Sequence, residues 1–162
     1  FFAEAQNKLL YAVTGKTAAE IIVSRADAGK PNMALTSWKG SVVRKQDIFT
    51  AKNYLNEDEI DTLNRLVVIF LESAELRAKN RMDITMKFWH ENVDRILEFQ
   101  DKNILQNAGS ISNRQMEAKV REIYAQYDKR RKEYEAQEAD KQDMEELKQL
   151  EEKIKKNDKK HS

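Results

Sequence analysis

Three capping signals divide the chain into helical segments, and this pattern constrains the fold more than any other feature of the sequence. In each signal a Ser, Thr or Asn is followed three residues later by Glu or Gln. Such a pair satisfies two backbone N–H groups at a helix start, because each side chain bonds the other residue's backbone. The pairs are Thr17 with Glu20, Asn56 with Glu59, and Ser112 with Gln115. Apolar residues follow each pair at spacings of three and four, so we predict an all-α fold.

The same spacing predicts where each helix lies. We expect helices over about 2–14, 17–28, 44–54, 57–80 and 85–106, and from 112 onward. The run from Leu66 to Leu71 is apolar on every side of a helix, which places the helix at about 57–80 at the centre of a helical bundle. An irregular loop at about 29–43 interrupts the pattern.

The character of the chain changes after residue 127. Most residues from 128 to 162 are charged, and pairs such as Glu151 with Lys155 suit an exposed helix. We therefore predict a helical domain over 1–127 and a charged C-terminal helix or tail over 128–162. A frayed tail is one possibility; the other is a coiled coil that makes a homo-oligomer or binds a partner protein. Its seam would hold Met144, Leu147, Leu150 and Ile154.

Composition excludes several classes of protein. The chain has no cysteine, which excludes disulfides and thiolate zinc sites, and its net charge of +1 confines any basic surface to one region. No apolar run approaches the roughly 20 residues of a membrane span, and no signal peptide is visible. We expect a cytoplasmic protein with no membrane partner. The chain opens on Phe1-Phe2 instead of methionine, so it looks like a fragment.

The motifs outside the loop do not indicate chemistry. Residues 15–17 read Gly-Lys-Thr, as at the end of a phosphate-binding P-loop, but Leu10 stands where that motif needs glycine. The acidic residues between 57 and 61 fit a helix start, where they meet the positive end of the helix dipole. His90 has no nucleophile or acid tied to it by sequence. We assign no catalytic residue and no metal ligand, and we expect no cofactor.

The stretch from Arg25 to Leu55, here called the central segment, is the strongest candidate for a site. It holds the chain's one proline. Between Asp27 and Asn56 it contains several basic residues, and Asp47 is the only acidic one. A positive patch with an aromatic residue suits phosphate, nucleotide or nucleic-acid contact. The proposed ligand-binding residues are Arg25, Asp27, Lys30, Asn32, Trp38, Lys39 and Asn53.

Each of these residue types has a role in such a site. Arg25 and Lys39 would bind an anionic group, and Asp27 would orient the ligand or take a proton. The asparagines would form hydrogen bonds, and Trp38 would stack on a planar group. Direct DNA contact is a weaker hypothesis, and its residues are Lys39, Arg44 and Lys45. In the alternative, Met33, Leu35 and Trp38 fold inward and clasp the helices, while the lysines are solvated.

Three long sequence segments resemble the RhuM family of bacterial virulence-associated proteins. They are AVTGKTAAEII at 12–22, RADAGKPNMALTSWKG at 25–40 and AKNYLNEDEIDTLNR at 51–65. The likeness continues more weakly through 85–89 and the turn at 107–109, and covers roughly Phe1 to Ser112. One departure is Ala34, where the family has glycine; because alanine disfavours positive φ, this puts a tight turn there in doubt.

The resemblance implies a context more than a chemistry. Family members are encoded on pathogenicity islands and other mobile genetic elements, and full-length members resemble a helix-turn-helix DNA-binding region followed by a helical domain. This chain resembles the second part, so DNA contact would come through an N-terminal region that it lacks. Some relatives carry a Fic/Doc-type toxin domain, whose His-Pro-Phe signature is absent here.

Two hypotheses of different classes follow. The first is a non-enzymatic helical module that regulates a DNA-binding protein through self-association or a partner protein. The second is a toxin-like enzyme or ligand-binding domain that uses the Arg25–Asn53 region on an anionic or phosphate-bearing ligand.

Overall fold

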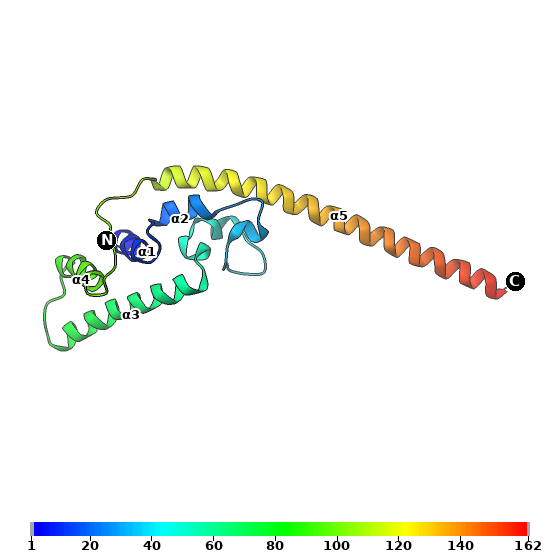
Figure 1. The fold of residues 1–162 in the computed structure, drawn as a ribbon. Helices are drawn as coiled ribbons and strands as arrows, with labels where there is room; N and C mark the ends of the chain where they lie inside the picture. Colours follow the sequence, from blue (N-terminus) through cyan, green and yellow to red (C-terminus); the bar gives the residue numbers. More distant parts are fainter. Residues whose placement is uncertain (1, 162) are drawn as a thin grey trace. The chain divides into compact units, whose positions relative to one another are not determined.

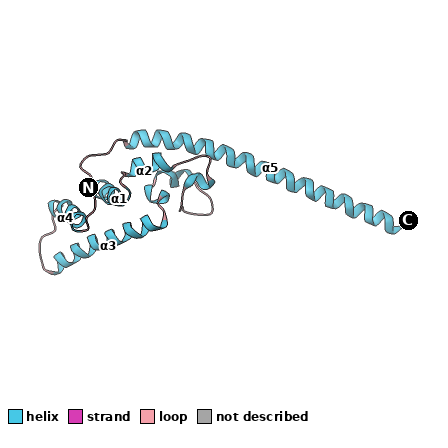
Figure 2. Cartoon of the chain, in the orientation of Figure 1, coloured by secondary structure: helices cyan, strands magenta, loops and turns pink. Residues whose placement is uncertain are grey.

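The computed structural model describes residues 2–161, and all of its secondary structure is helical over that range (Figure 2). The predicted all-α class is confirmed. The α-helices are α1 (Phe2–Thr14), α2 (Ala18–Arg25), α3 (Glu57–Lys79), α4 (Met86–Phe99) and α5 (Asn113–His161). Three short 3-10 helices lie in the central segment: η1 (Pro31–Ala34), η2 (Lys45–Phe49) and η3 (Ala51–Tyr54).

All three predicted capping pairs form. At the start of α3, the Asn56 side chain accepts a hydrogen bond from the Glu59 N–H at 2.8 Å, and the Asn56 N–H donates to Glu59 Oε1 at 3.0 Å. Thr17 with Glu20 and Ser112 with Gln115 make the same reciprocal bonds. Local hydrogen bonds thus begin α2, α3 and α5 where the sequence predicts.

Two helices are shorter than expected. α2 ends at Arg25 instead of near Ala28, because Ala26 is extended (φ −60°, ψ 126°) and leads into a turn. α4 ends at Phe99 instead of continuing to about 106. There Asp101 adopts φ 54°, and the Lys102 N–H bonds the Leu97 carbonyl at 2.9 Å, an arrangement that closes a helix.

The prediction of one helix over 44–54 is also wrong. Two 3-10 turns, η2 and η3, stand there, separated by Thr50 in an extended conformation (φ −104°, ψ 113°). Helical spacing alone does not distinguish one α-helix from two short 3-10 turns, because both bury residues three apart.

α1 packs against α2, α3 and α4, and so connects the other helices of the domain (Figure 1). The core between them is formed by buried apolar side chains of every α-helix: Leu9, Leu10, Ile21, Ile22, Leu63, Leu66, Val93, Leu97, Met116 and Val120. The sequence led us to expect apolar contacts on every side of α3, but one side of this helix is exposed. Val68, Ile69 and Leu71 are 56%, 37% and 51% exposed.

The central segment contributes to this core as much as a helix would. Its buried side chains are Met33, Leu35, Val43, Ile48, Ala51, Tyr54 and Leu55. The Tyr54 hydroxyl donates to the Ile48 carbonyl at 2.7 Å, and burial raises the pKa of this phenol. The inward folding of Met33 and Leu35, one of the two readings of the segment, is thus observed.

The turn at η1 is left-handed. Asn32, Met33 and Ala34 have φ values of 55°, 57° and 66°, and none of them is glycine. Such a conformation costs about 1–2 kcal/mol per residue for L-amino acids. Complete burial of Met33, whose exposed fraction is 0%, offsets part of that cost. The tight turn therefore forms even though alanine occupies position 34.

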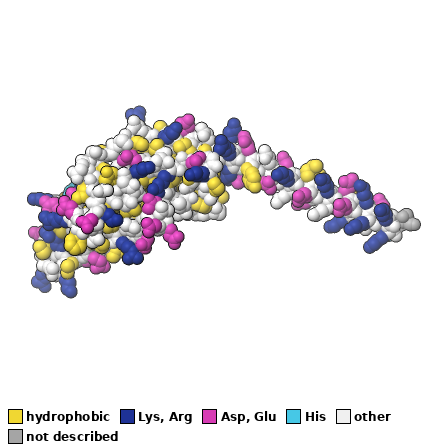
Figure 3. Space-filling model, in the orientation of Figure 1, with side chains coloured by type: hydrophobic (Ala, Val, Ile, Leu, Met, Phe, Trp, Pro, Cys, Tyr) yellow, Lys and Arg dark blue, Asp and Glu magenta, His cyan; other side chains and the backbone are white. Residues whose placement is uncertain are grey.

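The chain divides into two compact units, the first ending at Tyr124 and the second beginning at Ala125. The second unit consists of the remaining length of α5. Charged side chains of both signs alternate along this helix (Figure 3). None of the helices in the described part of the chain is long and apolar enough to cross a membrane.

The turn at 107–110 docks onto the capping box of α2. Ser110 donates to Glu20 Oε2 at 3.1 Å, and the Gly109 N–H bonds Asn107 Oδ1 at 2.8 Å. Gly109 has φ +87°, and a Cβ added there would lie 2.6 Å from Thr17 Cγ2. Only glycine fits this contact. It joins the turn around Gly109 to the helix start at Thr17, two segments that are far apart in sequence.

Gly109→Ala should therefore lower the free energy of unfolding by about 3 kcal/mol, since a left-handed alanine and an overpacked contact both destabilise. Gly40→Ala is the matched control: its φ is +79°, but nothing lies within 4 Å of the added Cβ. It should cost only about 1 kcal/mol. Urea denaturation of both variants measures the difference, and equal losses would contradict the docking contact.

Candidate functional site

Arg25 forms a bidentate ion pair with Glu59. Its Nη1 lies 2.6 Å from Glu59 Oε1 and its Nη2 lies 2.8 Å from Oε2, while Nη1 also donates to the Tyr54 carbonyl at 3.0 Å. The hydrogen bonds to Glu59 raise the pKa of Arg25, and the bond from Arg25 lowers the pKa of Glu59. The pair joins the end of α2 to the first turn of α3, so an anionic ligand at Arg25 would have to compete with Glu59.

Asp27, Lys30 and Asn32 belong to the turn that precedes and forms η1. The Asp27 carboxylate accepts from the Gly29 N–H at 2.9 Å, and the Lys30 N–H donates to the Asp27 carbonyl at 3.2 Å. The Asp27 N–H bonds the Met33 carbonyl at 3.3 Å. These contacts shape the turn, and none of the three residues lines the pocket described next.

The structure brings Trp38, Lys39 and Asn53 together in a pocket of about 560 Å³. Its other lining residues are Ser37, Gln46, Asp47 and Thr50. Three of the seven proposed ligand-binding residues therefore share one cavity, here called the Trp38 pocket. It combines an aromatic side chain, a lysine, a carboxylate and several hydrogen-bonding groups.

Asp47 is the buried member of this pocket, with an exposed fraction of 4%. Its Oδ2 accepts from the Arg44 N–H at 2.9 Å and its Oδ1 from the Lys39 N–H at 3.4 Å, which closes the loop between those residues. Within residues 2–161 it forms no ion pair. A buried carboxylate without a cation is uncommon. Sequence reasoning counted Asp47 only as the one acid among many bases, and so missed it.

Asn53 holds the pocket together from the other side. Its carbonyl accepts from the N–H groups of Thr36 at 2.7 Å and Ser37 at 3.4 Å. Its side-chain Nδ2 donates to the Asp47 carbonyl at 2.9 Å, and its Oδ1 accepts from the Ser37 hydroxyl at 3.2 Å. Asn53 is thus an anchor for the walls of the pocket, which keeps the pocket rigid.

The three residues proposed for nucleic-acid contact lie near one another. Lys39 and Arg44 bond the same carboxylate through their backbones, and Lys45 follows directly at the start of η2. All three side chains are exposed. Lys39 alone of the three lines the Trp38 pocket, whereas Arg44 and Lys45 are exposed neighbours of the buried Asp47 along the chain.

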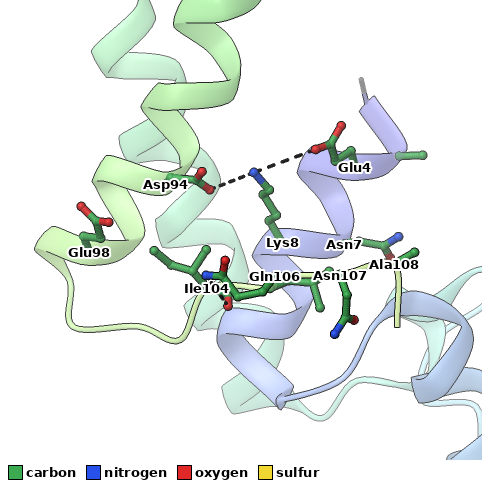
Figure 4. Close-up of a pocket in the computed structure, with 11 residues that line it drawn as sticks. Glu4, Asn7, Lys8, Asp94, Glu98, Ile104, Gln106, Asn107 and Ala108 are labelled. Atoms are coloured by element: carbon green, nitrogen blue, oxygen red, sulfur yellow. Dashed lines mark hydrogen bonds and ion pairs between the residues drawn. The ribbon is translucent and has the colours of Figure 1, made fainter. Parts of the chain in front are cut away.

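A second cavity, of about 740 Å³, lies between α1, α4 and the segment at 104–108 (Figure 4). Lys8 points between two acids there: its Nζ lies 2.9 Å from Asp94 Oδ1 and 4.0 Å from Glu4 Oε1. Lys8 already forms an ion pair with Asp94 of α4, so this network ties α1 to α4. Sequence reasoning could not find this cavity, because its walls come from opposite ends of the domain.

Within the described residues, no three His, Cys, Asp or Glu side chains are grouped so that they could hold a metal ion. The fold and the site define a small helical domain whose core is completed by an irregular segment, with one polar pocket built on that segment.

The model of the virulence protein RhuM family matches residues 1–135. The chain therefore belongs to the RhuM family, and the match continues beyond Ser112, where the resemblance read from the sequence fades. No curated protein and no solved structure matches the chain.

The Arg25–Glu59 pair should contribute strongly to stability, because it is bidentate and only 29% and 13% of its side chains are exposed. A double-mutant cycle with Arg25→Ala and Glu59→Gln should give a coupling energy of about 2 kcal/mol. Glutamine retains the capping bond to Asn56. The exposed pair of Arg65 with Asp61, at 2.9 Å, is the control and should give about 0.4 kcal/mol.

The same pair predicts a pH dependence. Because the folded-state pKa of Glu59 is lowered from its ordinary value of 4.5, its contribution is complete above that value and is lost as pH falls through the lowered pKa. Acid should therefore destabilise the wild type more than Glu59→Gln. Equal losses of unfolding free energy in the two proteins as the pH falls would contradict this prediction.

Proposed function

We propose that this chain is a non-enzymatic helical module that regulates a DNA-binding protein by associating with a second copy of itself through α5. The observation that carries the proposal is a stripe of apolar side chains on that helix. Met144, Leu147, Leu150 and Ile154 are 58%, 61%, 55% and 61% exposed. Their spacings of three, three and four put them on one face.

Physical chemistry favours a partner for this stripe. Ion pairs along the helix, such as Lys132 with Asp128 at 3.0 Å and Lys155 with Glu151 at 3.7 Å, stabilise a helix by only about 0.2–0.5 kcal/mol each. Most helical stability in proteins comes from packing an apolar face. Burying an exposed leucine or isoleucine gains about 1.5–3 kcal/mol, so pairing two stripes would stabilise both helices.

A second copy is the occupant that the charges favour. Glutamates and lysines both flank the stripe, among them Glu146, Lys148, Glu151 and Lys155. A surface with interspersed charges of both signs can complement itself across a twofold axis. In a full-length family member, a paired α5 would hold two DNA-binding regions at a set separation, as dimeric DNA-binding proteins require.

The test is sedimentation of the full chain and of a variant that carries Leu147→Gln with Leu150→Gln. The wild type should self-associate, and the variant should be a monomer with lower helix content, because its stripe is interrupted. The matched control carries Gln142→Ala with Gln149→Ala on the opposite face of the helix, and it should associate like the wild type. A monomeric wild type at high concentration would overturn the proposal.

We infer a second candidate function, binding of a phosphate-bearing ligand at the Trp38 pocket. Lys39 lines this pocket, and the exposed Arg44 and Lys45 follow a few residues later in the same loop, which supports this proposal. Pyrophosphate should bind in isothermal titration, with an affinity that falls as salt rises. Lys39→Ala should weaken it, whereas Lys52→Ala, an exposed lysine of the same segment that does not line the pocket, should not. Equal effects of the two variants would contradict the site.

A further inference from the structure

We propose that the Trp38 pocket selects a guanine nucleotide, with Asp47 binding the edge of the base. This inference rests on the proposed phosphate-bearing ligand of the same pocket and names its class. It gives a role to the buried carboxylate of Asp47, which shares the pocket with Lys39 and which simple phosphate binding does not require.

The free hydrogen-bonding capacity of Asp47 points to the base. A carboxylate offers about four lone-pair sites on its two oxygens. Each oxygen of Asp47 accepts one backbone N–H, from Lys39 or Arg44, so each retains capacity for one more donor. Because no cation pairs with Asp47 among the described residues, a ligand with two adjacent N–H donors would satisfy both oxygens.

Guanine presents such a pair, N1–H and the 2-amino group, side by side on one edge. Adenine places the acceptor N1 beside its amino group, and cytosine likewise places N3 beside its own. Uracil has one N–H between two carbonyl groups. Each of these edges would direct a lone pair at the carboxylate, and leaving buried polar groups unpaired or opposed discriminates strongly between ligands.

Trp38 supplies the stacking surface. It lines the same pocket as Asp47 and is only partly buried. Across residues 2–161 its ring makes no aromatic contact, and its indole N–H has no acceptor. An aromatic face of this kind stacks on a nucleobase with a gain of about 1–3 kcal/mol. A pocket of about 560 Å³ is of the size that binds small molecules.

Neighbouring basic side chains would hold the phosphates. Lys39 and Arg44 bond Asp47 through their backbones, so their side chains start beside the carboxylate that would take the base. Lys39 would offset the charge of Asp47, whereas the exposed side chains of Arg44 and Lys45 would be available to the phosphates at the other end of the nucleotide.

The first experiment compares GTP, ATP, inosine triphosphate and pyrophosphate in isothermal titration with the full chain. GTP should bind at least about tenfold more tightly than ATP and than inosine triphosphate, which lacks the 2-amino group and so loses one of the two donors. Equal binding of GTP and inosine triphosphate would overturn recognition by Asp47. Equal binding of all four ligands would overturn base selection but keep the phosphate site, and no binding would overturn both.

Two variants complete the test. Asp47→Asn keeps an acceptor for the Arg44 N–H and should abolish the preference for GTP over ATP. Trp38→Leu should weaken both nucleotides about tenfold while leaving pyrophosphate unchanged, because pyrophosphate has no base to stack. Lys52→Ala should bind all ligands like the wild type. A GTP preference that survives in Asp47→Asn would contradict the assignment, and the comparison of ligands on the wild type decides the matter if that variant does not fold.

Discussion

The bidentate ion pair between Arg25 and Glu59 is the contact on which the arrangement of this domain depends. It joins the last residue of α2 to the first turn of α3, and it closes the irregular central segment between them. A guanidinium and a carboxylate in fork geometry fix both direction and distance. With both ends held, the segment can follow an irregular path and still bury Met33, Ile48 and Leu55 completely or nearly so.

Hydrogen-bonding groups in this domain serve two purposes at once. Glu59 caps α3 and also binds Arg25, while Glu20 caps α2 and also accepts from Ser110. The second role joins elements that are distant in sequence, and it needs close approach, which Gly109 permits. The residues that cap a helix start therefore also bind that helix start to another part of the fold.

The central segment is both a clasp and the wall of a pocket. Most of its apolar side chains, such as Met33, Ile48 and Leu55, are buried in the core, whereas Trp38, Lys39 and Asn53 line a cavity. Asp47 and Asn53 hold the walls by hydrogen bonds to backbone groups, which fixes the positions of Lys39 and Arg44. Rigid positioning of this kind is what a binding site needs, so the two readings of the segment support each other.

The sequence by itself determined the features that depend on local hydrogen bonds and periodicity. The all-α class, the helix starts after Thr17, Asn56 and Ser112, and the end of α1 at Thr14 all follow from residues within one or two turns. The family likewise follows from long sequence segments. Such features are predictable because each is stabilised by neighbours along the chain.

Only the tertiary structure decided the rest. The two 3-10 turns at 45–54 and the exposed side of α3 depend on what packs against each segment. The Trp38 pocket needs residues 37–53 to fold back on themselves, and the cavity beside Lys8 needs α1 to meet α4 and the residues at 104–108. Asp47 acquires its role only when burial removes it from water and two backbone N–H groups turn toward it. These outcomes follow from contacts between residues distant in sequence, which local patterns do not encode.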